Sequence, residues 1–205
     1  MAGVELSDVL AGGDITAMNL GGALIGDAVQ DKDAVDLTLV PLDERITSLE
    51  DSHTLLLVAK SEALSQEPTV TDTPLQIEFG LAQTTTHIDL AVDGTITFKT
   101  GGRYIISPFF QYGRTGTASA SILLNRVLIN GAQSGNSLSA KIDNSSILVP
   151  WSSSIVITVA DNDVVTIEIM RDSTGNNSGG IFAFTPTVIG WAKAPCASIQ
   201  IYKVN

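Results

Sequence analysis

From Leu75 to the C-terminus, apolar and polar residues alternate with a period of two in a series of short runs. This period is typical of half-buried β-strands, and Asp93-Gly94 and Asn130-Gly131 are tight-turn signals between such strands. Many short strands with turns and no helical pattern predict a sandwich or barrel of about eight to ten strands. The predicted strands are 75–79, 87–92, 95–99, 103–112, 120–129, 146–151, 154–160, 164–170, 180–184 and 197–204.

Ahead of the strands, the sequence predicts a helical segment over 42–68. Pro41 precedes its first turn and Pro68 ends it. Apolar residues recur every seven positions, which predicts a short coiled coil, and a helix of this length is marginal by itself in water. A parallel bundle of identical helices is therefore predicted, with one helix packed on its own domain as the alternative. The predicted stem residues are Leu42, Ile46, Leu49, His53, Leu56 and Ala63.

Residues 1–41 are rich in Gly, Ala and Asp and show poor helical periodicity. Such a segment buries little surface alone, so it is predicted to take shape against a partner or against copies of itself. Its short apolar pieces between Ile15 and Val29 are broken by glycines, which indicates brief strands or turns. We therefore expect three parts: an N-terminal arm (1–41), a helical stem (42–68) and a strand-rich domain (69–205).

The charge is concentrated at the N-terminal end. Residues 1–72 hold 14 acidic and 3 basic side chains, whereas residues 73–205 hold 8 of each. An acidic arm fits docking onto a basic surface, and solvation of the arm is the alternative. The composition opposes a nucleic-acid partner, which a basic footprint would indicate. No apolar run of about 18 residues occurs, so no membrane span is expected, and the first residues do not resemble a signal peptide.

The residues that could carry chemistry are few. The chain has two histidines, His53 and His87, and neither has a second ligand at a zinc-binding spacing. Nucleophile-elbow and phosphate-loop motifs are absent from the sequence. A Ser-His-Asp triad stays open, because such triads are spatial. We expect no enzyme, no metal and no cofactor, and we expect Cys196 to be a buried small residue.

A second hypothesis is a binding module, whose candidate ligand site is the polar loop Asp172–Gly180 and the surroundings of Trp191. Trp151 and Trp191 could form a shelf for a sugar ring, although filling the sandwich or a subunit interface is the favoured interpretation. A host-surface glycan is the ligand expected for such a site. The candidate ligand residues are Asp172, Asn176, Asn177 and Trp191.

Four segments of the C-terminal region resemble the jelly rolls of the tumour necrosis factor and complement globular-head family. In VDGTITFKTGGRYIISPFFQYGR (92–114), Tyr104 would begin a core strand, and RVLING (126–131) is similar to the middle hairpin. SSIVITVADNDVVTIEI (153–169) resembles the turn before a long strand, with Asn162-Asp163 at the turn. ASIQIYKV (197–204) would be the closing central strand. The resemblance implies a C-terminal jelly-roll sandwich that assembles as a parallel trimer.

The N-terminal half resembles bacteriophage fibre and head-fibre proteins. The matching residues are Asn19-Leu20-Gly21, then Asp33-Ala34-Val35, then the helical pattern from Asp43. This resemblance implies a homotrimeric virion protein at the particle surface, docked on a major capsid or tail protein through residues 1–41. We expect a head-fibre or decoration protein, because a helix of about 25 residues reaches only about 37 Å. The alternatives are a receptor-binding tail fibre or a tail adaptor.

Overall fold

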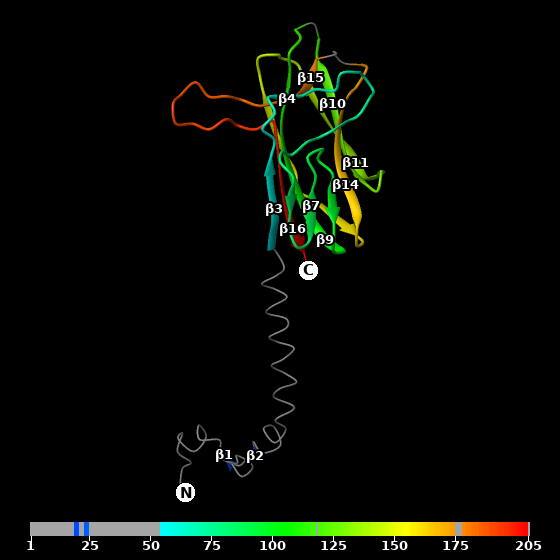
Figure 1. Cartoon of the computed structure of the whole chain (residues 1–205), viewed down its shortest axis with the longest axis vertical. Helices are drawn as coiled ribbons and strands as arrows, with labels where there is room; N and C mark the ends of the chain where they lie inside the picture. Colours follow the sequence, from blue (N-terminus) through cyan, green and yellow to red (C-terminus); the bar gives the residue numbers. More distant parts are fainter. Residues whose placement is uncertain (1–18, 21–22, 25–53, 118, 175–177, 205) are drawn as a thin grey trace. The chain divides into compact units, whose positions relative to one another are not determined.

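The computed structural model describes residues 19–20, 23–24, 54–117, 119–174 and 178–204. The chain divides into two compact units, Met1–Glu50 and Asp51–Asn205. The described residues of the second unit form a β-sandwich of two layers (Figure 1). Its strands are β3 (Thr54–Lys60), β4 (Ser65–Gln66), β5 (Leu75–Gln76), β6 (Gln83–Thr84), β7 (Ile88–Leu90), β8 (Ile96–Phe98), β9 (Gly102–Arg114), β10 (Ser121–Ile129), β11 (Ala132–Ile142), β12 (Val149–Ser152), β13 (Ile155–Val159), β14 (Asp163–Arg171), β15 (Gly179–Phe182) and β16 (Ala197–Val204).

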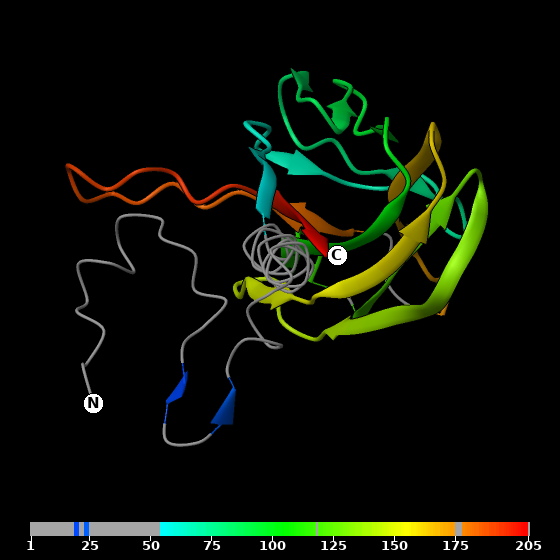
Figure 2. The same ribbon diagram turned by 90° about the horizontal axis from the view of Figure 1, so that it is seen from below.

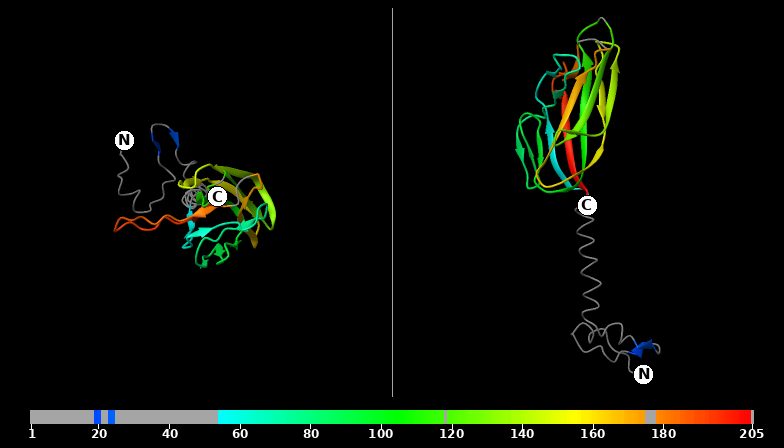
Figure 3. Two further views of the ribbon diagram at one scale, coloured as in Figure 1. Left: turned by 90° about the horizontal axis from the view of Figure 1, so that it is seen from above. Right: turned by 90° about the vertical axis from the view of Figure 1, so that its right-hand side faces the viewer.

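The strand order is that of a jelly roll. The first layer is called sheet I. In it, β16 lies between β3 and β9. β13 and β12 pair, one after the other, with the edge of β9 that faces away from β16. In the second layer, sheet II, the order is β11-β10-β14-β8-β7-β6. The chain crosses between the layers from β9 to β10, from β11 to β12 and from β13 to β14, as in double-sheet jelly rolls. The end-on views show the two layers facing each other (Figures 2 and 3). The predicted jelly-roll sandwich is confirmed.

The core lies between the two layers and follows the period-two pattern of the strands. Tyr104 and Phe98 are fully buried, with ring centroids 4.6 Å apart. The Tyr104 hydroxyl donates a hydrogen bond to the carbonyl oxygen of Thr100 at 2.7 Å, so its polar atom is not left without a partner. Full burial of such a side chain stabilises the fold by about 1.5–3 kcal/mol. Tyr104 therefore lies near the start of a core strand, as the family resemblance implied.

The helix predicted over 42–68 is wrong from Thr54 onward. In β3, Leu57 and Ala59 are buried while Val58 and Lys60 are exposed, which is the alternation of a strand. Short apolar runs fit both periods, and pairing of β3 with β16 decides between them by satisfying the backbone. The stem residues Leu56 and Ala63 instead pack against the sandwich core. The sandwich consequently begins at Thr54, and the boundary predicted at residue 69 is too late.

The remaining stem residues lie outside the described residues: Leu42, Ile46, Leu49 and His53. In the first unit, the structure describes one antiparallel pair, β1 (Asn19–Leu20) with β2 (Ala23–Leu24). This pair lies within the stretch from Ile15 to Val29, for which the sequence predicted brief strands or turns.

Turn residues fix the register of the long hairpins. Asn130 and Gly131 both have positive φ, at 50° and 79°, and form a tight turn between β10 and β11, as the tight-turn signal predicted. Asn162 takes a φ of 65° before β14, the left-handed conformation for which asparagine is one of the better-suited residues. β11 itself was not predicted, because most of its side chains are polar and exposed and only Ile142 is buried. Pairing with β10 therefore determines the strand conformation of β11 more than the sequence of β11 does.

Candidate interaction surface

The outer face of sheet I carries apolar side chains in register across three strands. Ile105 of β9 lies directly between Tyr202 of β16 and Val156 of β13. Residues directly opposite one another share a face, so these three form one continuous row. Val156 is 54 % exposed, and Ile105 and Tyr202 are half-buried. This row is an apolar surface that the described part of the chain leaves facing outward.

The next rows of the same face are uncharged and rich in hydroxyl groups. Gln200 and Ser107 are opposite each other, and the Ser107 and Ser154 hydroxyls are 3.0 Å apart. Phe109, half-buried, follows between Ser198 and Ser152. Side chains of these rows line an open hollow of about 530 Å³. A face of this kind has no ionised group to desolvate when another surface covers it.

Charged side chains on this face lie at its margins. Lys60 is opposite Ser198 in the register of β3 and β16, and it forms an exposed ion pair with Glu62 at 3.3 Å. Arg103, exposed, is opposite Thr158 at the other end of β9. An uncharged centre with charges at the rim is the usual composition of a protein–protein interface.

The candidate ligand residues do not form one site. Asp172 follows β14, and its carboxylate accepts the backbone N–H of Thr174 at 2.8 Å and also the Thr174 hydroxyl. Both hydrogen bonds lower the pKa of Asp172, and the bond from the Thr174 hydroxyl has the larger effect. Trp191 lies in a different segment, between β15 and β16, and is 75 % exposed. Asn176 and Asn177 lie outside the described residues.

The two tryptophans have different environments. Trp151 is half-buried and stacks on Phe110 with an interplanar angle of 2° and a centroid distance of 5.5 Å. It therefore fills the sandwich, as the favoured interpretation of the sequence held. A sugar shelf made by both tryptophans of one chain is wrong, because Trp151 is occupied by core packing. Trp191 alone remains available to a ligand or a partner.

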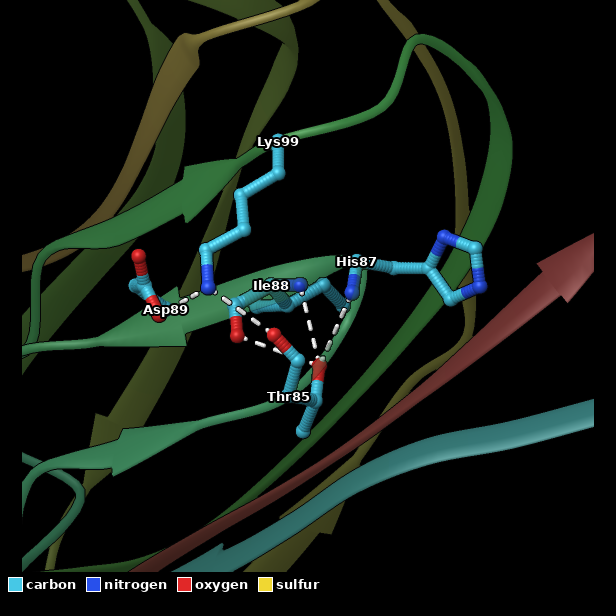
Figure 4. A network of polar contacts seen from close by, with 5 residues as sticks. All are labelled: Thr85, His87, Ile88, Asp89 and Lys99. Carbon is cyan, nitrogen blue, oxygen red and sulfur yellow. Dashed lines mark hydrogen bonds and ion pairs between the residues drawn. The ribbon is translucent and has the colours of Figure 1, made fainter.

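The histidine that the structure describes, His87, belongs to a turn-bracing network (Figure 4). The Thr85 hydroxyl accepts the backbone N–H of Ile88 at 2.9 Å, and Lys99 donates to the Thr85 carbonyl at 2.9 Å. Lys99 also forms an ion pair with Asp89 at 2.7 Å. The hydrogen bond from Lys99 to Asp89 is the largest cause of the lowered pKa of Asp89. The His87 ring points away from this pair. The network holds the β6–β7 turn and presents no carboxylate to the imidazole.

The described residues show no candidate metal cluster and no membrane-spanning helix. They contain no cluster of three or more His, Cys, Asp or Glu side chains arranged to hold a metal ion. Over the same residues, no helix has the length and apolar character to cross a membrane. Cys196 is fully buried, as expected from the sequence, and its sulfur accepts a hydrogen bond from the Gln66 amide at 3.5 Å.

Comparisons with known proteins give a sparse result. No family model matches the chain, and no curated protein matches it. Among solved structures, the chain is similar to the globular domain of a zebrafish complement 1qA protein. That match has a TM-score of 0.40 and 14% sequence identity, and it covers 74% of this chain and 96% of the other. The jelly-roll assignment rests on the strand order of the chain itself.

Sequence patterns missed the outward row of sheet I, although they contained a signal for it. In the run from Arg103 to Tyr112, both alternating sets include large apolar residues. Tyr104 and Phe110 face the core, and Ile105 and Phe109 face outward. A strand that is apolar on both faces is typical of one covered on both sides. The pattern therefore indicated a second contact surface as well as a strand.

Proposed function

We propose that the chain is a non-enzymatic, homotrimeric structural protein of a bacteriophage particle, a head fibre or capsid decoration protein. The observation that carries the proposal is the uncharged outer face of sheet I, with its row of Tyr202, Ile105 and Val156. Contact between copies removes such a surface from water, with a gain of about 25 cal/mol per Å² of apolar area. A closed ring of identical contacts covers the face once in every copy.

The corrected start of the sandwich supports assembly through the sandwich itself. β3 begins at Thr54, so a helical stem can occupy only residues 42–53 of the segment predicted for it. A helix of about 12 residues is marginal even in favourable sequences. The stem residues Leu42, Ile46 and Leu49 then add to a trimer that the sandwich organises. Residues 51–205 alone should accordingly assemble.

Charge segregation supports the division between a docking end and an exposed end. Residues 1–72 carry 14 acidic and 3 basic side chains, whereas the rest of the chain is balanced. Three acidic segments side by side favour a basic docking surface on a major capsid or tail protein. Trimerisation also makes each weak attachment part of a stronger multivalent one. The resemblance of Asn19-Leu20-Gly21 to phage head fibres points to the same end of the chain.

The particle assignment is tested by localisation. Antibodies raised against residues 51–205 should label phage particles purified from cells that carry the gene, and mass spectrometry of those particles should find the chain. Labelling of the capsid supports the head-fibre assignment, and labelling of the tail moves the proposal to a tail adaptor. Particles that contain none of the protein would contradict the virion role.

A second candidate function is a receptor-binding tail protein that holds a host-surface glycan. The observation that favours it is Trp191, whose ring is 75 % exposed, because an exposed aromatic face suits a sugar ring. A glycan array probed with the full chain should then give a signal that Trp191→Ala abolishes and Trp191→Phe partly keeps. A silent array, or a signal that both variants preserve, would remove this candidate.

A further inference from the structure

Between β15 and β16 the chain forms a projecting hairpin, Phe184–Ala194, here called the apolar hairpin. Its apolar side chains face solvent: Ile189 is 100 % exposed, Trp191 75 % and Val188 62 %. The views from above and below both show this segment, orange to red, extending away from the sandwich beside β3 (Figures 2 and 3). Residues 184–192 include no charged side chain. An exposed apolar patch of this kind marks an interaction site.

The apolar hairpin is held firmly at its base. The backbones of Phe184 and Ala194 exchange two hydrogen bonds, at 3.0 and 2.9 Å. Lys193 donates to the Glu62 carbonyl at 2.6 Å, and the Gln111 amide donates to the Pro195 carbonyl at 2.7 Å. These bonds fix the direction in which the hairpin leaves the sandwich. A preformed element loses less conformational entropy on binding than a loose one.

The opposite edge of sheet I carries a second uncharged apolar strip. β12 pairs with the side of β9 away from β16, so it lies at the far edge from β3. Ile147, just before β12, is 52 % exposed, and Val149 within it is 38 % exposed. Residues 144–160 contain no charged side chain. The strip Ile147–Ser152 is here called the β12 edge.

These two features lie on opposite edges of one sheet, so a single copy cannot bring them together. The segment between β3 and β4 adjoins the base of the hairpin, because its Glu62 carbonyl accepts a hydrogen bond from Lys193 and its Leu64 carbonyl accepts one from Ala183, just before the hairpin. Two complementary patches on opposite sides of one molecule make a head-to-tail contact, and such contacts close into rings when the rotation allows. Each copy offers one hairpin and receives one.

We propose that the apolar hairpin of one copy packs against the β12 edge of the next copy around the ring. This inference rests on the proposed homotrimer and names the contact that links its subunits at their edges. Both surfaces are uncharged, so covering them desolvates no ionised group, and Ile189 and Trp191 leave water. A second copy is favoured over a foreign partner because the chain itself supplies both matching surfaces in equal number.

Photocrosslinking on the full chain tests the contact without assuming its register. Trp191 is replaced by p-benzoylphenylalanine, which bonds covalently to whatever C–H groups lie beside it on illumination. We expect covalent dimers and trimers in denaturing gels, with crosslinked peptides that map to residues 144–156. The matched control is the same replacement at Thr86, an exposed turn residue of sheet II, which should give no crosslink to that region.

The outcomes separate failure of this contact from failure of the trimer, because the mass of each sample is measured before illumination. A trimer whose crosslinks map elsewhere, or form only within one chain, overturns the hairpin contact and leaves the trimer standing. A monomer before illumination overturns the trimer and this contact together. As a second measurement, Ile189→Lys should weaken the trimer at least tenfold in dissociation constant, and adding Val149→Asp should recover part of that loss. No recovery, with both variants folded, would count against direct contact.

Discussion

The hydroxyl oxygen of Tyr112 accepts a hydrogen bond from the side-chain amide of Asn125, and this bond joins the two layers of the sandwich. Tyr112 lies on β9 of sheet I, and Asn125 lies on β10 of sheet II. Both side chains are buried, and burial raises the pKa of Tyr112 while the bond to Asn125 opposes the rise. The tyrosine is therefore a neutral hydroxyl at neutral pH.

Removing the Tyr112 hydroxyl should destabilise the sandwich by leaving the Asn125 amide buried with an unused donor. We expect Tyr112→Phe to lower the free energy of unfolding by about 1–3 kcal/mol, measured by denaturant titration. Ser137→Ala is the control, because the Ser137 hydroxyl accepts its hydrogen bond from the Gln133 side chain at an exposed site of sheet II. Equal losses in both variants would show that the interlayer bond has no special cost.

Gly94 should be required for space as well as for its backbone conformation. A Cβ atom there would lie 1.8 Å from the carbonyl oxygen of Ile77, whereas one at Gly135 would meet nothing within 4 Å. Both glycines have positive φ, at 85° and 73°, so alanine costs each about 1–2 kcal/mol. Gly94→Ala should lower the melting temperature well below that of Gly135→Ala. Indistinguishable melting curves would contradict the packing described around Ile77.

The Lys99–Asp89 pair gives stability a defined dependence on pH. The hydrogen bond from Lys99 lowers the pKa of Asp89 below its ordinary 3.8, so the folded protein binds this proton less readily than the unfolded chain. The contribution is present at neutral pH and is lost as the pH falls below about 4, through the folded-state pKa. In Asp89→Asn and in Lys99→Met, the free energy of unfolding should fall less steeply as the pH drops below about 4, which is the acid limb of its pH profile. An unchanged limb in both variants would show that the pair is not coupled to folding.

A charge at the centre of the sheet I face should dissociate the assembly without unfolding the chain. In Val156→Asp, each copy would bury an unpaired carboxylate in the interface, at a cost of about 3–5 kcal/mol. Light scattering should then report single chains whose far-UV circular dichroism matches the parent. Thr86→Asp adds the same charge at an exposed turn of sheet II and should leave the mass unchanged. A Val156→Asp trimer of normal stability would place the interface elsewhere.

Strand patterns predicted most of the sandwich because its long strands alternate strictly over a shared core. β9, β14 and β16 are examples, with every second residue buried over most of their length. β3 escaped prediction because the run from Leu55 to Ala59 fits a helix and a strand equally, and only its pairing with β16 resolves the choice. β11 escaped because an exposed edge strand has little apolar pattern to detect.

The interaction surface was less predictable, because it depends on which residues the fold places side by side. Tyr202, Ile105 and Val156 are far apart in sequence and meet only through the register of three strands. Trp191 was predicted as a candidate from its residue type alone. Its isolation from Asp172 follows from the hairpin that carries it, which bonds to the Glu62 carbonyl through Lys193. Composition indicates that a surface exists, and topology decides which residues compose it.

The trimer is tested most directly by the mass in solution of the full chain beside the fragment Asp51–Asn205, measured by light scattering. The full chain should have three times the mass of the 21.5 kDa chain, and the fragment should also be a trimer. Such a result would place assembly in the sandwich and leave residues 1–41 free for docking. Single-chain masses for both would contradict the trimer, and with it the proposed contact between neighbouring copies.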